Sequence, residues 1–346
     1  MKPLATARPN RPAFFRPLGF DPTHLSDSVP TVLIRTDTET PVFPGESTVV
    51  TIGAYDGLHI GHQAVIQHVC EEARARGVRS AVVTFDRHPA AIVRPQSAPC
   101  LLTDAEQRLE LFAQTGVDAV VVLPFDIAQA QESAGAFIDR VLVKGLQAEH
   151  VVVGDDFHFG RHREGNVAFL REAGKAAGFS VEPLSLIGRA DGIVEPVSST
   201  AIRRALAGGG VAVAAQMLTR PFEVRGQVAH GDQRGRTLGF PTANVEVPQR
   251  VCSPADGVYA GWYERPTGEV HACAINIGRR PTFYEHANTS LLEAHLIDFD
   301  GDLYGQPAKV RFVRFVRSER KFAGIDELVD QMNRDTDRTR QILGYS

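Results

Sequence analysis

The sequence predicts a two-domain protein, in which a doubly wound parallel α/β domain precedes an antiparallel β domain that ends in a C-terminal helix. Short apolar strands alternate with helical stretches from about Thr48 to Gly210. Such alternation is typical of a parallel sheet covered by helices on both faces. The pattern then changes to strand-like segments separated by Gly, Pro and Asp turns. The length of 346 residues also suits two domains of roughly 100–200 residues each.

The first domain is predicted from four strands and the helices between them. Strands are expected at 48–52, 81–85, 119–123 and 151–153, and helices near 65–73, 104–115, 134–144, 167–177 and 199–207. Three glycines at 208–210 stop the last helix. Ligands of such sheets bind beyond the carboxyl ends of the strands, so the loops after Ile52, Phe85 and Val153 are the expected binding sites.

A short helix near 211–218 leads into the second domain. Its strands are expected near 223–229, 257–264, 270–277, 291–297 and 308–316, followed by a helix at 325–343 with Leu328, Met332, Thr339 and Leu343 on one face. The expected division is an N-terminal extension at 1–47 and domains at 48–210 and 218–346. Because four prolines interrupt the first seventeen residues, we expect a disordered or loosely attached tail rather than a transit peptide.

Composition excludes several classes of protein. The net charge of −4 gives no electrostatic reason to expect a nucleic-acid partner. No apolar run approaches the ~20 residues that span a bilayer. The four cysteines form no C-x-x-C pair, and a disulfide framework is not expected at this size, so a reduced cytoplasm fits best. The sequence leaves the oligomeric state open.

The first chemical motif follows the strand at 48–52 and reads G-A-Y-D-G-L-H-I-G-H, from Gly53 to His62. Its glycines permit a tight turn beside a ligand, and Gly61 lets a phosphate approach the start of the next helix. His59 and His62 are three residues apart, so both project from one side of the first turn and can donate hydrogen bonds to a polyphosphate. Two surface histidines or half of a metal site would be the alternative, but the strand-to-helix context favours nucleotide binding.

A second motif, V-S-S-T-A-I-R-R at 197–204, opens the helix at 199–207. Either Ser198 or Ser199 would cap that helix. The hydroxyl groups and Arg203 would also form a second phosphate clamp.

Together, H-x-G-H and S-S-T-x-I-R resemble the nucleotidyltransferase superfamily. Two further loops, T-F-D-R-H-P at 84–89 and V-G-D-D-F-H-F-G at 153–160, resemble the FMN adenylyltransferase module of bacterial bifunctional FAD synthetases. The resemblance implies that ATP is bound by Gly53, Asp56, His59, Gly61, His62, Ser199, Thr200 and Arg203, with the two histidines catalytic. It also implies that the flavin is held by Phe85, His88, Pro89 and Asp156. The chain departs from the family pattern at Ala54, Tyr55 and Asn166.

The second domain carries G-D-Q-R-G-R-T-L-G-F-P-T-A-N at 231–244. Glycines at 231, 235 and 239 can lay backbone N–H groups on phosphates, although a turn-rich hairpin would have the same spacing. Thr242 and Asn244 point to one face of an extended segment, and their oxygens are hard ligands suited to Mg²⁺.

G-F-P-T-A-N resembles the riboflavin kinase module, as do N-I-G-R-R-P-T-F at 276–283 and L-E-A-H-L at 292–296. The resemblance, which covers 48–345, implies an antiparallel β-barrel that phosphorylates riboflavin to FMN, before the first domain converts FMN to FAD. It implies ATP binding by Gly231, Gly235 and Gly239, Mg²⁺ binding by Thr242 and Asn244, flavin binding by Asn276 and Arg279, and Glu293 as the base. The alternatives are an enzyme with one surviving activity and a non-catalytic flavin or nucleotide sensor.

Overall fold

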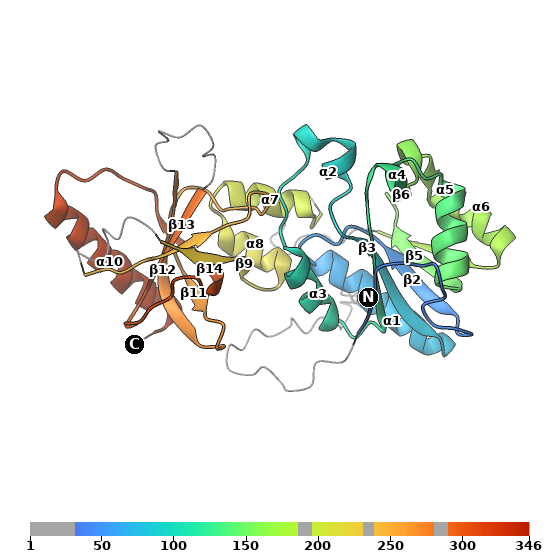
Figure 1. Ribbon diagram of the computed structural model, residues 1–346, viewed down its shortest axis with the longest axis horizontal. Coiled ribbons are helices and arrows are strands. Elements are labelled where there is room, and N and C mark those ends of the chain that lie inside the picture. The colour runs from blue at the N-terminus through green and yellow to red at the C-terminus, as the bar shows by residue number, and fades with distance from the viewer. Residues whose placement is uncertain (1–31, 186–195, 231–238, 280–289, 346) are drawn as a thin grey trace, which may run out of the picture.

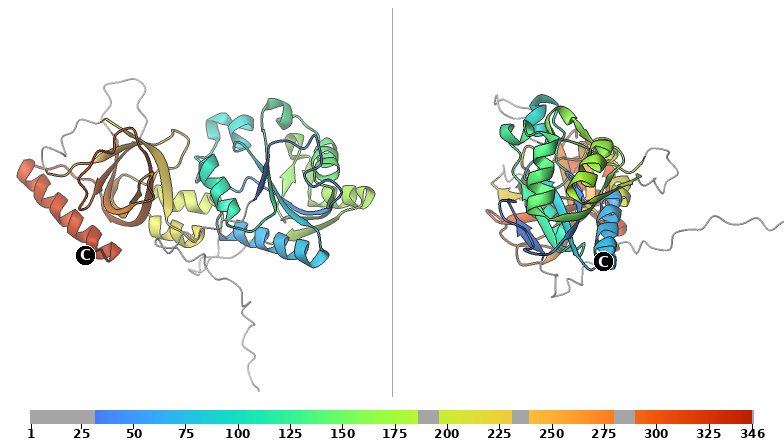
Figure 2. Two further views of the ribbon diagram at one scale, coloured as in Figure 1. Left: turned by 60° about the horizontal axis from the view of Figure 1, so that its bottom comes forward. Right: turned by 90° about the vertical axis from the view of Figure 1, so that its right-hand side faces the viewer.

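A computed structural model describes residues 32–185, 196–230, 239–279 and 290–345 (Figure 1). It contains a parallel α/β domain and an antiparallel barrel, with α7 (Ser199–Ala207) and α8 (Val211–Leu218) between them. The same arrangement is visible in the left view of Figure 2, whereas the right view looks along the long axis with the α/β domain in front. The expected fold class is therefore confirmed, whereas residues 1–31 of the extension expected at 1–47 lie outside the described residues.

The first domain is a sheet of six parallel strands in the order β1-β4-β3-β2-β5-β8. The strands are β1 (Leu33–Arg35), β2 (Thr48–Ile52), β3 (Arg79–Phe85), β4 (Ala119–Leu123), β5 (Ala148–Gly154) and β8 (Ser180–Leu184). A separate small ribbon is formed by β6 (His158–Phe159) and β7 (Gly165–Asn166). The four predicted strands are present, and β1 and β8 were not predicted; β1 shows that the sheet begins upstream of Thr48.

Helices cover both faces of the sheet. The helices of this domain are α1 (Ile60–Arg76), α2 (Ala90–Val93), α3 (Ala105–Ala113), α4 (Ile127–Ala130), α5 (Ala134–Phe137) continuing into η2 (Ile138–Gly145), and α6 (Val167–Ala177). Two short turns are η1 (Pro95–Ser97) and η3 (Arg161–Arg163). Val82 packs with α1 and α3 on one face, while Val83 packs with η2 and α6 on the other. Because successive side chains enter opposite cores, the central strands β2, β3 and β4 are buried at successive positions rather than at alternate positions.

The second domain is a closed barrel with the strand order β10-β13-β12-β11-β14-β9, all pairs antiparallel. Its strands are β9 (Phe222–Ala229), β10 (Ala243–Glu246), β11 (Gly257–Glu264), β12 (Val270–Arg279), β13 (Ser290–Leu296) and β14 (Pro307–Arg317). Helix α10 (Ile325–Leu343) packs outside β11, β12 and β14. Closure pairs every strand on both sides, which removes exposed sheet edges.

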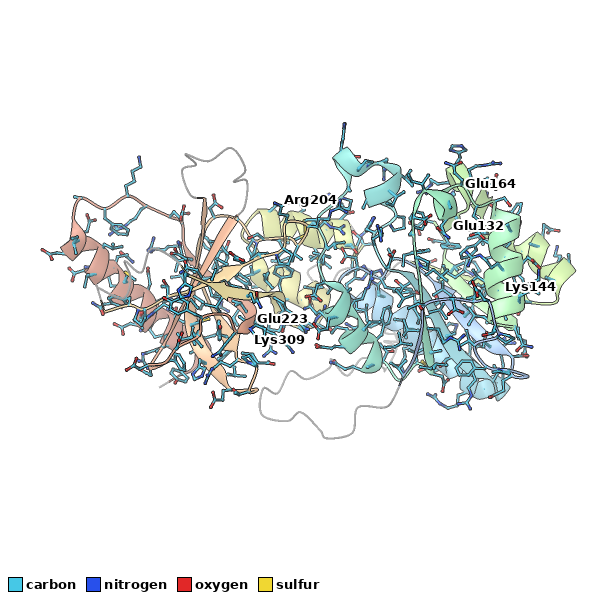
Figure 3. All side chains as sticks on the ribbon, viewed as in Figure 1. Glu132, Lys144, Glu164, Arg204, Glu223 and Lys309 are labelled. Carbon is cyan, nitrogen blue, oxygen red and sulfur yellow. A yellow bond between two sulfur atoms is a disulfide. The ribbon has the colours of Figure 1, made fainter. Side chains whose placement is uncertain are left out.

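The two domains share a hydrophobic core. Leu206 of α7 and Leu218 of α8 belong to the same buried cluster as the barrel residues Phe222 and Tyr259. Charged groups extend this contact at its rim, where Arg225 of β9 bonds to Glu110 of α3. Figure 3 labels Glu223 and Lys309 on the barrel side of this boundary. The domains therefore pack as one body rather than hanging from a flexible linker.

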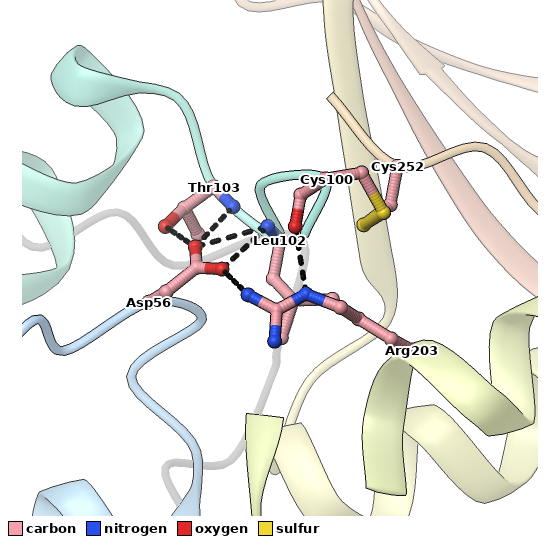
Figure 4. Close-up of a disulfide and its surroundings, with 6 residues drawn as sticks. All are labelled: Asp56, Cys100, Leu102, Thr103, Arg203 and Cys252. Carbon is pink, nitrogen blue, oxygen red and sulfur yellow. Dashed lines mark hydrogen bonds and ion pairs between the residues drawn. A yellow bond between two sulfur atoms is a disulfide. The ribbon is translucent and has the colours of Figure 1, made fainter. Parts of the chain in front are cut away.

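The expectation about cysteines was wrong in one respect, because Cys100 and Cys252 form a disulfide across the domain boundary (Figure 4). Their Cα atoms lie 5.0 Å apart, although 152 residues separate them in sequence. Main-chain bonds bring the segments together: the Leu101 amide donates to Arg250 O (2.7 Å), and the Cys252 amide donates to Leu101 O (2.8 Å). Sequence spacing carries no sign of such a contact.

Three arginines on β14 and just after it form ion pairs within the chain. Arg311 pairs with Glu223 and Glu264. Arg317 pairs with Asp335 of α10, and Arg320 with Glu327. Within the described ranges, no helix is both long and apolar enough to cross a membrane.

Candidate active sites

The first candidate site is built on the histidine loop (residues 53–59), which joins β2 to α1. Its backbone is unusual: Tyr55, Gly57 and Leu58 have φ values of 49°, 87° and 36°. A positive φ is costly for residues with a Cβ, so surrounding contacts must hold this loop in place. Tyr55 provides one of them, since its buried hydroxyl lies 2.5 Å from Thr51 Oγ1 and its ring meets the edge of His62.

His59 and His62 are stacked at the start of α1, with ring centroids 3.6 Å apart. His59 is the N-cap residue, and its Nδ1 accepts a hydrogen bond from the His62 amide (3.3 Å). Since Nδ1 is an acceptor, the proton of the neutral ring must be on Nε2, which remains available as a donor. Gly61 makes the stacking possible, because a Cβ there would lie 3.2 Å from the His59 ring.

Both histidines are neutral at physiological pH. Burial lowers the pKa of His59 to about 4, and the charges of Arg220 and Arg203 lower it as well. The pKa of His62 is held well below its usual value by burial, by His59 and by Arg220. His62 Nδ1 is also buried without a hydrogen-bond partner among the described residues. An unpartnered polar atom in such a position indicates a place for a ligand.

Asp56, a buried residue of this loop, forms an ion pair with Arg203 of α7 (Figure 4). The Asp56 carboxylate also accepts bonds from the Leu102 amide (2.9 Å) and the Thr103 amide (3.2 Å). Arg203 Nε donates to Cys100 O (2.7 Å). Donors within the chain therefore satisfy the Asp56 carboxylate, which binds Arg203 and the loop at 100–103 in this structure.

The hydroxyl residues of the second motif have different positions. Ser198 caps α7 by accepting from the Ala201 amide (3.1 Å), whereas Ser199 Oγ donates to Asp56 O (2.9 Å). Thr200 is exposed on the first turn of α7. The structure thus brings Ser199 and Arg203 to the histidine loop, as the sequence predicted from two segments about 140 residues apart.

The expected flavin-binding residues lie along the same edge of the sheet, because β3, β2 and β5 are neighbours. Phe85 ends β3, and Pro89 precedes α2. Burial lowers the pKa of His88, as does the charge of Arg203. Asp156 follows β5 and is exposed.

Sequence reasoning missed a buried arginine at this edge. Arg108 of α3 donates from Nη2 to Phe85 O (2.6 Å) and from Nη1 to Ala54 O (3.3 Å). Arg108 therefore connects the end of β3, where the expected flavin-binding residues begin, to the histidine loop. The departure at Asn166 also has a structural explanation, since its Oδ1 accepts from the Phe169 amide and caps α6.

The second candidate site is a row of polar residues across three strands of the barrel. Asn244 of β10 pairs in register with Glu293 of β13, which pairs with Asn276 of β12. Directly paired residues share a face, and the adjacent row of Val245, Leu292 and Ile277 points into the core. The polar row therefore faces outward, with Asn244 buried and the other two half-buried.

The segment before β10 is fixed against this row. His295, the residue two beyond Glu293, donates from Nδ1 to Pro241 O (2.9 Å), and its ring contacts Phe240. Thr242 is two residues before Asn244 and so shares its side of the extended segment. Gly239 has a φ of 86°, whereas Gly231 and Gly235 lie outside the described residues. The Arg279 backbone ends β12, paired with Ser290.

Hard oxygen donors from Thr242 and Asn244 suit a divalent ion that also touches phosphate oxygens. A metal site that is complete without substrate is not expected there. Within the described segments, no group of three or more His, Cys, Asp or Glu residues could hold a metal ion. One or two protein donors can suffice for a divalent ion shared with ATP, since water and phosphate oxygens supply the other ligands.

Comparisons with known proteins match both halves of the chain. A family model described as FAD synthetase matches residues 44–201, and one described as riboflavin kinase matches 218–343. The chain is 41% identical over 307 residues to the bifunctional riboflavin kinase/FMN adenylyltransferase of Escherichia coli K12, covering 88% of this chain and 95% of that protein. The Bacillus subtilis enzyme of the same name is 37% identical, covering 83% of this chain and 90% of that protein.

The chain belongs to the bifunctional riboflavin kinase/FMN adenylyltransferase family. It is an enzyme with both activities, so it carries out the two steps from riboflavin through FMN to FAD. Kinases and nucleotidyltransferases of these families generally use ATP with a divalent metal ion. The one-activity and sensor alternatives are thereby set aside.

A solved structure supports the same arrangement of domains. A Streptococcus pneumoniae protein, named as a macrolide-efflux protein, superposes with a TM-score of 0.79 at 29% identity, covering 89% of this chain and 98% of that one. Its name assigns that protein another role, so the likeness supports the fold alone.

Proposed function

We propose that the first site transfers AMP from ATP to FMN through the residues around the histidine loop. The observation that supports this most is the stacked pair of His59 and His62 at the start of α1. The Nε2–H of His59 is available as a donor, and the Nδ1 of His62 has no hydrogen-bond partner among the described residues. Helix N-termini favour anions, so ATP phosphates would lie there. Gly53, Gly61, Ser199 and Thr200 would line the same phosphates, and Arg203, oriented by Asp56, would neutralise them.

In the proposed reaction, an oxygen of the FMN phosphate attacks the α-phosphorus of ATP, and the bond to the β-phosphate oxygen breaks to release pyrophosphate. The two neutral imidazoles stabilise the negative charge that develops on the phosphates. Phe85, His88, Pro89 and Asp156 would hold the flavin beside them. No protein nucleophile is required, because positioning and charge neutralisation account for catalysis of this kind.

We propose that Glu293 is the general base of the kinase step. It would accept the proton of the riboflavin 5′-hydroxyl, whose oxygen attacks the γ-phosphorus of ATP as ADP leaves. Its place between Asn244 and Asn276 supports this role. Mg²⁺ held by Thr242 and Asn244 would neutralise phosphate charge, with Gly231, Gly235 and Gly239 contacting the phosphates, and Asn276 and Arg279 contacting riboflavin.

The substrates are thus ATP, riboflavin and FMN, with no nucleic-acid or membrane partner proposed. We propose a cytoplasmic location, where these metabolites would be met. The Cys100–Cys252 disulfide is unusual for that compartment.

Two single substitutions test the assignment of the steps. With FMN supplied, His59→Ala should lower the rate of FAD formation by about 10²-fold or more, because a charge-stabilising donor is lost, and should leave FMN formation from riboflavin unchanged. Glu293→Ala should lower FMN formation by about 10²–10⁴-fold and leave FAD formation from FMN unchanged. Chromatography of the flavins measures both rates. A reversed or shared pattern of losses would refute the assignment.

A further inference from the structure

Arg220 joins the domain junction to the histidine loop. It lies between α8 and β9, and its Nη2 donates to Gly57 O (2.7 Å). Its Nη1 donates to Leu218 O (3.0 Å) and has a longer contact with Leu58 O (3.5 Å). Among the described residues, all of its hydrogen-bond partners are main-chain carbonyls. A planar guanidinium can span these carbonyls at once, which a single ammonium group cannot.

These bonds hold a loop that needs support. The carbonyls of Asp56, Gly57 and Leu58 each accept from a different donor: Ser199 Oγ (2.9 Å), Arg220 Nη2 (2.7 Å) and Gln63 Nε2 (2.8 Å). Because a peptide unit is planar, fixing the Leu58 carbonyl also fixes the direction of the His59 amide, where α1 begins. Loss of the central donor would free the loop to leave its positive-φ conformation.

The charge of Arg220 acts on both imidazoles. It is among the causes that lower the pKa of His59 and of His62. Burial lowers the pKa of Arg220 itself only to about 10, so it stays protonated at neutral pH. Among the described residues, the other titratable or charged groups near the imidazoles are Arg203 from α7, the Asp56 carboxylate that pairs with it, and Tyr55, whose ring contacts His62.

We propose that Arg220 is a positioning residue for adenylyl transfer, which fixes the histidine loop and thereby the directions in which His59 and His62 can donate hydrogen bonds. The proposal rests on the roles proposed above for these two histidines. Arg220 lies in the segment that joins the two domains. Under this proposal it affects the adenylylation site and not the kinase site. Arg220 itself need not touch ATP.

Arg220→Met in the full-length enzyme tests this. It should lower kcat/KM for FMN adenylylation by about tenfold or more, the factor that corresponds to one charge-assisted hydrogen bond. Removing the cation raises the pKa of the histidines, so the acid limb of the adenylylation pH profile should move to higher pH. Riboflavin kinase activity of the same chain, and its midpoint of thermal unfolding, report whether the variant is folded. The kinase rate should stay within about twofold of wild type, since among the described residues Arg220 bonds only to carbonyls of Gly57, Leu58 and Leu218.

Two further variants separate positioning from general loosening of the domains. Arg220→Lys keeps the charge but not the fork, so the acid limb should stay in place while only part of the lost rate returns. Arg225→Met is the matched control, because Arg225 joins the barrel to α3 through Glu110 and, among the described residues, has no hydrogen bond to the histidine loop. It should leave adenylylation within about twofold of wild type.

The proposal is overturned if Arg220→Met leaves adenylylation unchanged, lowers it without moving the acid limb, or lowers both activities together. An equal loss in Arg225→Met would also overturn it, because the effect would then belong to the domain contact as a whole. His59→Ala, assayed in parallel, keeps the two hypotheses apart. If that variant adenylylates FMN normally, the proposed role of His59 fails, whatever Arg220 does.

Discussion

At the scale of single residues, the site motifs could be predicted because their geometry is local. His59 and His62 share one helical turn, and Glu293 faces away from Leu292 and Ala294 on one strand, so spacing alone gives their relative directions. Arg220 and Arg108 could not be predicted, since they reach Gly57 and Ala54 over 163 and 54 residues. Only tertiary packing shows that these arginines belong to the site.

The neutral state of His59 predicts a dependence of stability on pH. Its folded-state pKa of about 4 lies below the ordinary value near 6.5, so the unfolded chain takes up a proton in this range while the folded chain does not. The free energy of unfolding should therefore fall as the pH drops through this window. The His59→Gln protein has no titratable group at this position, so its free energy of unfolding should fall less over the same pH range. Thermal unfolding of both proteins between about pH 7 and about pH 5 measures the difference. Equal losses in the two proteins would contradict the prediction.

At the scale of elements, alternation of apolar strands and helices was enough to predict β2, β3, β4 and β5, because each is buried on both faces. The edge strands β1 and β8 were missed, since β1 has only three residues and Pro183 interrupts β8. The loop at 98–103 has no regular structure, yet it crosses to the barrel and supports Asp56. Its role depends on a long-range crosslink that no local pattern reveals.

The Cys100–Cys252 disulfide predicts an effect on the free energy of unfolding. Cys100→Ser removes the disulfide at its exposed end and should lower the free energy of unfolding by about 2–4 kcal/mol, because the unfolded chain is no longer constrained. A dithiol reductant should lower the unfolding midpoint of the wild type to a similar extent. The same reductant should have no effect on the variant, which serves as the control. An unchanged wild-type midpoint in the presence of reductant would show that the crosslink does not stabilise the protein in solution.

At the scale of the whole molecule, the order of the two domains was readable from the sequence, but their packing was not. Helices α7 and α8 follow the sheet in sequence and yet share the barrel's hydrophobic core, where Leu218 and Phe222 are fully buried. Hydrophobic periodicity says which face of a helix is buried, but not against which partner. The result is one body with two sites, in which the junction residue Arg220 bonds to the histidine loop of the first site.

The central claim is that each half of the chain holds one complete site. Mixing the His59→Ala and Glu293→Ala proteins with riboflavin, ATP and Mg²⁺ tests it most directly. Alone, the first protein should stop at FMN and the second should leave riboflavin unchanged. Together they should produce FAD after a lag, because FMN released by one protein is adenylylated by the other. If the mixture forms no FAD although each protein keeps its remaining single-step activity, FMN does not pass in solution between separate, complete sites, and the account is contradicted.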